Sequence, residues 1–371
     1  MLTSRLCMGV LGVIVLLGFG VTSAAQARPF GQVLSATLEE MAVPGLGYAV
    51  VEGGELTETS GLGVANADTG EKITAETPFR VASLTKPLSA ALLLSAAEKG
   101  EASLDTPLRE ASSKFRRGCP SMKLYLTVNR LPYLDGIECE SDDILVRHVL
   151  THTAKAPPGS EYSYNGFLFG LLSDEIGDVT VGGGDDNFIQ AVHREIIGPL
   201  GLEHTAAGVT DAERVDVISR LAAPHQQRDG AWVVGPPLAE PLNAGAGLIA
   251  SAEDMAKIDM AYQDRLVSSN AIWEQMTTPT ALTNGSRSPY GMGWFVQEVG
   301  GREVLWHYGH QPDAYSGLWI KDVEHGRTLI VLANSGELAA GHDLHEGDVT
   351  RSPLARLFLA WSSEQGKYTT P

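Results

Sequence analysis

The sequence predicts a mixed α/β fold of the α+β type, with one antiparallel sheet built from both chain ends and flanked by helices. A mostly helical domain is inserted between the two halves. Short apolar runs meet at a glycine pair near the start, Gly53-Gly54, and again near the end, Gly300-Gly301, as in two-residue hairpins. The stretch between them is mostly helical in pattern. A chain of 371 residues, 43% of them hydrophobic, is able to bury a large core.

The N-terminal half of the predicted sheet follows a helix. Residues Pro29 to Met41 have the amphipathic pattern of a surface helix. Two strand-like runs come next, Gly45 to Glu52 and Glu55 to Val64, and the glycine pair between them favours an antiparallel hairpin.

The C-terminal half supplies the remaining strands. Predicted strands are Gly293–Val299, Arg302–His307, Tyr315–Val323 and Thr328–Ala333, with a turn at Glu324-His325-Gly326. Predicted helices begin at Ser251, which precedes an acidic third residue, and at Leu354, which leads to Trp361. We therefore assign residues 28–80 and 283–371 to a discontinuous sheet domain and residues 81–282 to a helical domain.

The first 27 residues have the composition of a secretory signal peptide. Arg5 precedes an uncharged apolar run from Leu6 to Val21, and the small residues Ala25-Gln26-Ala27 form a cleavage site. The alternative is an uncleaved membrane anchor, although the run is slightly short for a full span. We expect an exported protein, periplasmic or secreted, without a stable membrane span once residues 1–27 are removed.

The charge balance limits the range of partners. A formal net charge of −18 at pH 7 argues against nucleic acid or an anionic lipid surface as a partner. A small-molecule or peptide-like substrate is the expected partner, and no cofactor is expected. The stretch His342-Asp343-Leu344-His345-Glu346 contains metal-ligand residue types, but it lies in a glycine-rich acidic region, so no metal site is assigned. The sequence does not indicate an oligomeric state.

Two cysteines outside the predicted signal peptide form an even pair. Cys119 and Cys139 bracket a segment rich in turn-forming and aromatic residues. In an oxidising compartment this pair favours a disulfide, which would close a loop of about 20 residues and stabilise the fold by about 3 kcal/mol in the chain-entropy model. The alternative is two separate buried thiols.

The stretch Ser83-Leu84-Thr85-Lys86 carries the main chemical hypothesis. Residues i and i+3 share one face of a helix, so the lysine can reach the serine hydroxyl. A serine hydroxyl becomes a good nucleophile only beside a base. Lysine can be that base if burial or a nearby cation lowers its pKa from about 10.4 towards neutrality. Pro87 follows directly, and proline fits only the first turn of a helix, so the helix must begin close to Ser83.

Two further segments contain residues suited to proton transfer. Tyr164 lies in a loop between predicted helices, where a lysine ammonium would favour its phenolate form and allow it to shuttle protons. The alternative for Tyr164 is a core aromatic residue. His307 ends a predicted strand, and Gly309 after it would let another backbone or a ligand approach closely. A buried structural histidine is the alternative for His307.

The order of these motifs resembles the serine β-lactamase and penicillin-binding-protein superfamily. The motifs are Ser-x-x-Lys, a tyrosine in a Pro-Gly-x-x-aromatic-x-Tyr setting, and His-x-Gly. The most similar branch contains class C β-lactamases, D-Ala-D-Ala carboxypeptidases and related esterases. Other stretches with counterparts there are Phe79–Lys86, Leu104–Leu108, Ile144–Thr153, Pro199–Leu202, Ala246–Asp254 and Tyr290–Trp294. The resemblance covers roughly residues 30 to 335 and implies the same split architecture, a β-lactamase/transpeptidase-like fold.

The resemblance also implies a role for each matching residue. Ser83 would be the acylated nucleophile, Lys86 its base or activator, and Tyr164 the relay of a proton to the leaving group. His307 would occupy the third-motif position, where relatives often have lysine. The resemblance further implies backbone N–H groups of Ser83 and His310 as the oxyanion hole, and contacts to substrate from Asn165, Gly166 and Gly309.

This chain departs from the family pattern in ways that bear on substrate. The second motif is Tyr164-Asn165-Gly166 instead of Tyr-Ser-Asn or Tyr-Ala-Asn, so glycine stands where an asparagine amide normally contacts the substrate. Losing that hydrogen bond would cost about 1–3 kcal/mol with a polar substrate. His307 in place of lysine removes a fixed cation for a substrate carboxylate.

The resulting hypothesis is an exported serine hydrolase that acts on esters or amides through an acyl-enzyme. D-Ala-D-Ala carboxypeptidase and β-lactamase are the alternatives within this class. An alternative of another class is a non-catalytic protein that keeps the fold and binds cell-wall fragments. Pro87 and Gly166 are the residues that would favour it.

Overall fold

The structure is a computed structural model that describes residues 28–37, 42–183 and 187–365. The predicted signal peptide, residues 1–27, lies outside the described residues, as does the end of the predicted N-terminal helix, residues 38–41. Within the described residues, no helix combines the length and hydrophobicity needed to cross a bilayer.

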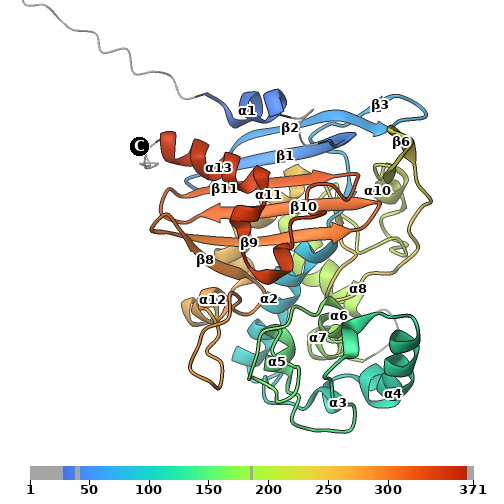
Figure 1. The fold of residues 1–371 in the computed structure, drawn as a ribbon, viewed down its shortest axis with the longest axis vertical. Helices are drawn as coiled ribbons and strands as arrows, with labels where there is room; N and C mark the ends of the chain where they lie inside the picture. The colour runs from blue at the N-terminus through green and yellow to red at the C-terminus, as the bar shows by residue number, and fades with distance from the viewer. Residues whose placement is uncertain (1–27, 38–41, 184–186, 366–371) are drawn as a thin grey trace, which may run out of the picture.

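The main sheet is antiparallel and joins the two ends of the chain. Across the described residues it has seven strands in the order β3-β2-β1-β11-β10-β9-β8, and β1 lies between its hairpin partner β2 and the C-terminal strand β11 (Figure 1). Leu46 of β1 therefore pairs with Leu62 on one side and with Ala333 on the other. The predicted sheet from both chain ends is confirmed.

The strands have the following bounds. In the main sheet they are β1 (Gly45–Glu52), β2 (Glu55–Asn66), β3 (Glu71–Lys72), β8 (Phe295–Val299), β9 (Arg302–Gln311), β10 (Tyr315–Asp322) and β11 (Arg327–Ala333). Two small pairs accompany it, β4 (Phe79–Arg80) with β7 (Ile249–Ala250) and β5 (His225–Arg228) with β6 (Ala231–Val234).

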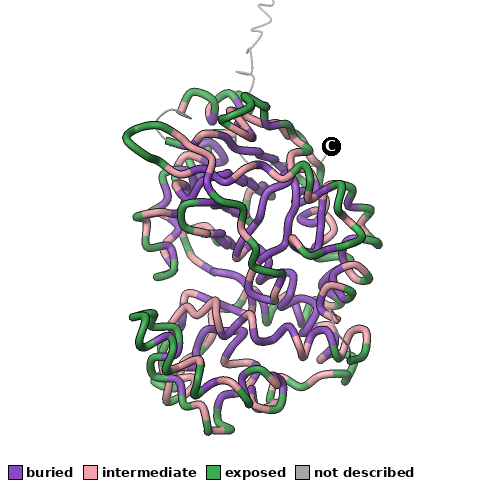
Figure 2. The backbone as a smooth tube through the Cα atoms, turned by 90° about the vertical axis from the view of Figure 1, so that its right-hand side faces the viewer, coloured by how far each residue is buried: buried purple, intermediate pink, exposed green. Residues whose placement is uncertain are grey.

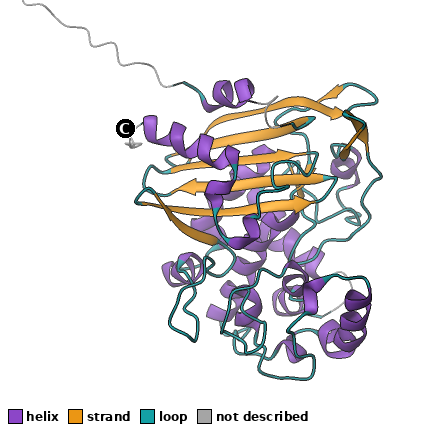
Figure 3. Ribbon diagram, in the orientation of Figure 1, coloured by secondary structure: helices purple, strands orange, loops and turns teal. Residues whose placement is uncertain are grey.

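The helices lie at both chain ends and in the long middle segment (Figure 3). Their bounds are α1 (Phe30–Thr37), α2 (Thr85–Glu98), α3 (Leu108–Ala111), α4 (Ser113–Val128), α5 (Val146–Leu150), α6 (Gly166–Gly170), α7 (Ser173–Val181), α8 (Asn187–Val192), α9 (Gly198–Leu200), α10 (Val215–Ser219), α11 (Ala252–Ala261), α12 (Asn270–Thr277) and α13 (Pro353–Glu364). The predicted helix start at Ser251 is confirmed, since its hydroxyl accepts a hydrogen bond from Asp254 N at 3.0 Å.

The two faces of the sheet carry separate cores. Helices α1 and α13 cover one face, where the rings of Phe30 and Phe358 meet at 5.8 Å. Helices α2 and α11 cover the other face and join it to the core of the helical part. Buried backbone runs through the centre of the molecule, with exposed segments around its rim (Figure 2). Ser83, just before α2, and Lys86, in its first turn, thus lie between the sheet and the helical part.

Some element bounds differ from the sequence predictions. Strand β9 continues to Gln311, past the predicted end at His307, because Gln311 still pairs with Tyr315 of β10. Strand β8 begins at Phe295. Gly293 before it has φ 98°, and a Cβ at that position would lie 2.7 Å from Ala90 Cβ. The β5–β6 hairpin lies in a stretch that the sequence pattern assigned to helices. The predicted domain boundaries, 28–80 with 283–371 and 81–282, stay a prediction.

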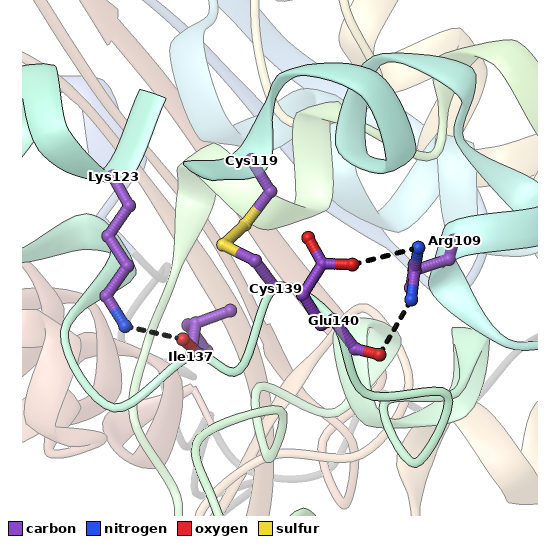
Figure 4. Close-up of a disulfide and its surroundings, with 6 residues drawn as sticks. All are labelled: Arg109, Cys119, Lys123, Ile137, Cys139 and Glu140. Carbon is purple, nitrogen blue, oxygen red and sulfur yellow. Dashed lines mark hydrogen bonds and ion pairs between the residues drawn. A yellow bond between two sulfur atoms is a disulfide. The ribbon is translucent and has the colours of Figure 1, made fainter. Parts of the chain in front are cut away.

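The predicted disulfide is present. Cys119, buried in α4, is bonded to Cys139 in the loop that follows (Figure 4). Around it, Lys123 donates a hydrogen bond to the carbonyl oxygen of Ile137 at 2.7 Å, and Arg109 pairs with the Glu140 carboxylate at 3.2 Å. The bridge ties the loop of residues 129–140 to α4.

Candidate active site

Ser83 lies in a strained turn that leads into α2. The turn Ala82–Leu84 is a 3-10 helix, and Ala82 before the serine has φ 48°, a conformation that costs a non-glycine residue about 1–3 kcal/mol. Strand β4, just before it, pairs with β7, and Val81 N donates to Leu248 O at 2.9 Å. The surrounding structure therefore holds the half-buried Ser83 against the preference of the local backbone.

Lys86 is the buried amine in contact with Ser83. Its Nζ lies 2.8 Å from Ser83 Oγ and 2.8 Å from the carbonyl oxygen of Gly245, and the residue is 1% exposed. Burial without a carboxylate partner lowers the pKa of Lys86 to about 7. At neutral pH a large fraction of the amine is uncharged and able to accept a proton.

Pro87 is compatible with this geometry. The α-helix begins at Thr85, so Pro87 is the third helical residue, where a backbone N–H would lack a helical acceptor. The proline carbonyl accepts a hydrogen bond from the Tyr262 hydroxyl at 2.6 Å. The predicted helix start close to Ser83 is confirmed.

Gly309 lets strand β9 reach the nucleophile turn. A Cβ atom at this position would lie 2.5 Å from the carbonyl oxygen of Val81 and 3.3 Å from Ala82 Cβ. Its register partner on β10, Gly317, faces the same turn, since a Cβ there would lie 3.1 Å from Leu84 Cδ1. The backbone next to His310 and the backbone of the turn are therefore in direct contact.

Tyr164 lies beside Lys86, in the loop that enters α6. The centre of its ring is 5.1 Å from Lys86 Nζ, and its hydroxyl is buried without a hydrogen-bond partner among the described residues. Burial raises the pKa of Tyr164 well above its usual value, and the neighbouring Tyr308 raises it further. The expectation that Lys86 would favour a phenolate is wrong, because burial disfavours the charged form of Tyr164.

His307 is enclosed and held in one tautomer. It is 0% exposed, its Nδ1 lies 2.8 Å from the Tyr308 carbonyl oxygen and its Nε2 lies 3.0 Å from the Tyr290 hydroxyl. A carbonyl only accepts hydrogen bonds, so Nδ1 carries the hydrogen and Nε2 accepts from Tyr290. Burial, with the Lys86 charge, holds the pKa of His307 well below its usual value. The ring is neutral, and both nitrogens are used within the protein.

Asn165 and Gly166 start helix α6 beside Lys86. The Asn165 side-chain oxygen accepts from Leu168 N at 2.9 Å, and its amide nitrogen donates to the Tyr133 carbonyl oxygen. The asparagine amide is thus engaged as a helix cap and tether. A Cβ at Gly166 would lie 3.3 Å from Lys86 Nζ, so glycine leaves the space around the amine open.

The structure adds residues to which the sequence assigned no role. Gly245 supplies the second acceptor for Lys86, Tyr290 donates to His307, and His152 packs its ring on Tyr164 with centroids 4.3 Å apart. His152 and Tyr290 lie in stretches that carry the family resemblance, so the resemblance could have pointed to both residues. Gly245 contributes only its backbone carbonyl oxygen, which every residue carries, so its residue type offered no clue.

The acidic loop near the C-terminus does not gather into a metal site. Among the residues that the structure describes, no group of three or more His, Cys, Asp and Glu residues could hold an ion, and this includes His342, Asp343, His345 and Glu346.

Comparison with known proteins gives the family. The β-lactamase family profile matches residues 30–348, a range that contains Ser83, Lys86, Tyr164 and His307. The chain belongs to the β-lactamase family. The D-aminopeptidase of Gluconobacter oxydans strain 621H is 25% identical over 283 residues, which cover 72% of this chain and 51% of that protein. The chain spans about half the length of the curated relatives it matches.

Solved structures of similar fold extend over most of this β-lactamase-family chain. The octameric penicillin-binding protein homologue from Pyrococcus abyssi has a TM-score of 0.68 at 21% identity and covers 84% of this chain and 74% of its own. The D-amino acid amidase from Ochrobactrum anthropi SV3, complexed with D-phenylalanine, has a TM-score of 0.64 at 19% identity and covers 90% and 98%. The predicted fold class is confirmed by these likenesses.

Proposed function

We propose that this protein is a serine hydrolase that acts on amides and esters through an acyl-enzyme at Ser83. The single observation that carries the proposal is the contact between Lys86 Nζ and Ser83 Oγ at 2.8 Å, made by a lysine whose pKa burial lowers to about 7. A base with a pKa near the working pH combines a useful neutral fraction with proton affinity.

The proposed reaction has two halves. The Ser83 oxygen attacks the substrate carbonyl while its proton passes to Lys86, and the N–H groups of Ser83 and His310 stabilise the oxyanion. The bond to the leaving group breaks as Tyr164 protonates the departing atom and regains a proton from Lys86. Water then attacks the Ser83 ester and gives one proton to Lys86, which returns it to the serine oxygen as the acid is released.

The electrostatics of the site favour substrates without a carboxylate next to the scissile bond. His307 is neutral with both ring nitrogens engaged. Arg80, which is 3% exposed, donates to the carbonyl oxygens of Leu238 and Glu240. A carboxylate that arrives with the leaving group would therefore lose water without gaining a charge partner from His307 or Arg80. This disfavours acyl-D-Ala-D-Ala and β-lactams relative to amides and esters with neutral leaving groups.

The names of the relatives support small amide substrates. Relatives named D-aminopeptidase and D-amino acid amidase act, by their names, on D-amino acid derivatives. We infer that D-amino acid amides and short esters are the first substrates to test.

The deciding experiment is covalent labelling. Wild-type protein treated with a fluorophosphonate should gain one adduct on the peptide that contains Ser83, measured by mass spectrometry. Ser83→Ala should gain none. Ser89→Ala is the matched control, because Ser89 lies on α2, directly after the turn that carries Ser83, and its hydroxyl donates to the Thr85 carbonyl oxygen at 3.2 Å. An unlabelled wild type would favour the alternative of a non-catalytic binding protein.

We also propose that the protein is exported after cleavage behind Ala27. The Cys119–Cys139 disulfide supports this, since such bonds persist in oxidising compartments. N-terminal sequencing of protein recovered from the periplasm or the medium should begin at Arg28. Recovery of the intact N-terminus in the membrane fraction would instead support the uncleaved anchor.

A further inference from the structure

His152 adopts a backbone conformation that few residue types tolerate. It follows α5 with φ 55°, in the left-handed region, where asparagine, aspartate and histidine are enriched among non-glycine residues. The residue is 2% exposed, and its N–H donates to the Val149 carbonyl oxygen at 3.2 Å. A strained residue at full burial beside a catalytic tyrosine indicates a constraint beyond packing.

His152 holds the chain on both sides of Tyr164. Its carbonyl oxygen accepts from Ser163 N at 2.8 Å, and its ring Nδ1 accepts from Asn165 N at 3.1 Å. Between these two bonds its ring lies against the Tyr164 ring, with centroids 4.3 Å apart. One residue thus contacts the tyrosine, the residue before it and the residue after it.

The bond to Asn165 defines the tautomer of His152. Nδ1 accepts a backbone N–H, so the hydrogen of the neutral ring is on Nε2, which is buried without a partner among the described residues. Burial, Lys86 and His307 hold the pKa of His152 well below its usual value. The ring therefore stays neutral at working pH, and Nδ1 stays available as an acceptor.

The contacts of His152 with Ser163, Tyr164 and Asn165 also affect the surroundings of Lys86. Asn165 caps helix α6, and a Cβ at the following residue, Gly166, would lie 3.3 Å from Lys86 Nζ. A shift of this loop would change the distance between Tyr164 and Ser83 and the space around the lysine amine. Misplacement of a catalytic group by about 1 Å costs roughly a hundredfold in rate.

We propose that His152 is a positioning residue for Tyr164, which fixes the tyrosine through its carbonyl oxygen, its Nδ1 acceptor and its ring. The proposal rests on the proposed hydrolase function, in which Tyr164 protonates the leaving group. Loss of His152 should therefore harm substrates whose leaving group needs a proton more than substrates whose leaving group departs as a stable anion.

The test compares two variants that both tolerate a positive φ. His152→Asn keeps a side-chain acceptor near the Nδ1 position, whereas His152→Gly has none, and both lack the ring. Each is assayed with a p-nitrophenyl ester, whose leaving group needs no proton, and with a D-amino acid amide, whose leaving group does. Circular dichroism and melting temperature confirm that each variant is folded.

The expected result is a split between the two substrates. His152→Gly should lose roughly a hundredfold in kcat on the amide and less than about tenfold on the ester. His152→Asn should recover part of the amide rate. Added to Tyr164→Phe, His152→Gly should cause no further loss on the amide, because residues that act as a unit are not additive.

Other outcomes would overturn the proposal. Equal losses on both substrates in a folded His152→Gly variant would indicate general damage, and a full additional loss in the Tyr164→Phe background would indicate an independent role. If His152→Gly misfolds, the folded His152→Asn variant provides the test: its loss of kcat on the amide is compared with its loss on the ester. A wild type that no fluorophosphonate labels would refute the hydrolase itself, which the labelling experiment reports separately.

Discussion

The Lys86 amine lies 2.8 Å from the Ser83 hydroxyl, and within the described part of the chain no carboxylate compensates its charge: burial alone moves its pKa to about 7. The second contact of the amine is the Gly245 carbonyl oxygen, also at 2.8 Å, which accepts from the charged and the neutral form alike. This relationship places beside Ser83 an amine that changes its charge in the physiological range.

The first prediction is a pH profile. Only neutral Lys86 can take the Ser83 proton, so kcat/KM for a p-nitrophenyl ester should rise about tenfold per pH unit below pH 7 and level off above it. His310→Asn should keep this apparent pKa, which would separate the lysine from the nearby histidine. A profile that is flat from pH 5 to 9 would contradict the assignment of Lys86 as the base.

The second prediction concerns Gly309. A methyl group there would lie 2.5 Å from the Val81 carbonyl oxygen, so Gly309→Ala must push β9 away from the nucleophile turn. We expect kcat on the ester to fall at least about a hundredfold. Gly118→Ala in α4 is the control, because its nearest contact is the flexible Met122 side chain at 3.4 Å. A folded Gly309→Ala protein with wild-type kcat would show that the close approach is unimportant.

The third prediction concerns substrate preference and rests on Gly166. Wild-type kcat/KM should be higher for short activated esters than for penicillins. Gly166→Asn should narrow that ratio by about tenfold to a hundredfold, the equivalent of one hydrogen bond to the substrate amide.

The control for this prediction is Gly166→Ala. It adds the same Cβ atom, 3.3 Å from Lys86 Nζ, without an amide. Both variants should lose absolute rate because the lysine must shift, but only the asparagine variant should change the ratio. Efficient penicillin hydrolysis by the unaltered protein would refute the argument.

The fourth prediction is the contribution of the disulfide to stability. Cys119 and Cys139 are 20 residues apart, so replacing both by serine should lower the free energy of unfolding by about 3 kcal/mol in the chain-entropy model. Chemical denaturation measures this. A reductant should reproduce the loss in the wild type and leave the double variant unaffected. Equal unfolding free energies in the two proteins would refute the estimate.

Sequence patterns predicted the elements whose causes are local. Glycine pairs at 53–54 and 300–301 end strands whatever lies around them, and the β1–β2 and β8–β9 hairpins are present. Sequence patterns were less reliable where pairing with a distant segment decides the secondary structure. The register with β10 extends β9 past His307, and the β5–β6 hairpin forms inside a stretch with a helical pattern.

The sequence by itself determined the fold class and the Ser83–Lys86 pair, because a hairpin turn and an i, i+3 spacing are properties of neighbouring residues. Only the tertiary structure decided the charge states. The Lys86 pKa depends on burial, the carbonyl oxygen that its amine contacts is 159 residues away, and His307 Nε2 accepts from Tyr290, which is 17 residues away. Desolvation and long-range hydrogen bonds arise only when distant segments pack together, so no local pattern records them. The contacts of His152 with Tyr164 and Asn165 likewise depend on tertiary packing.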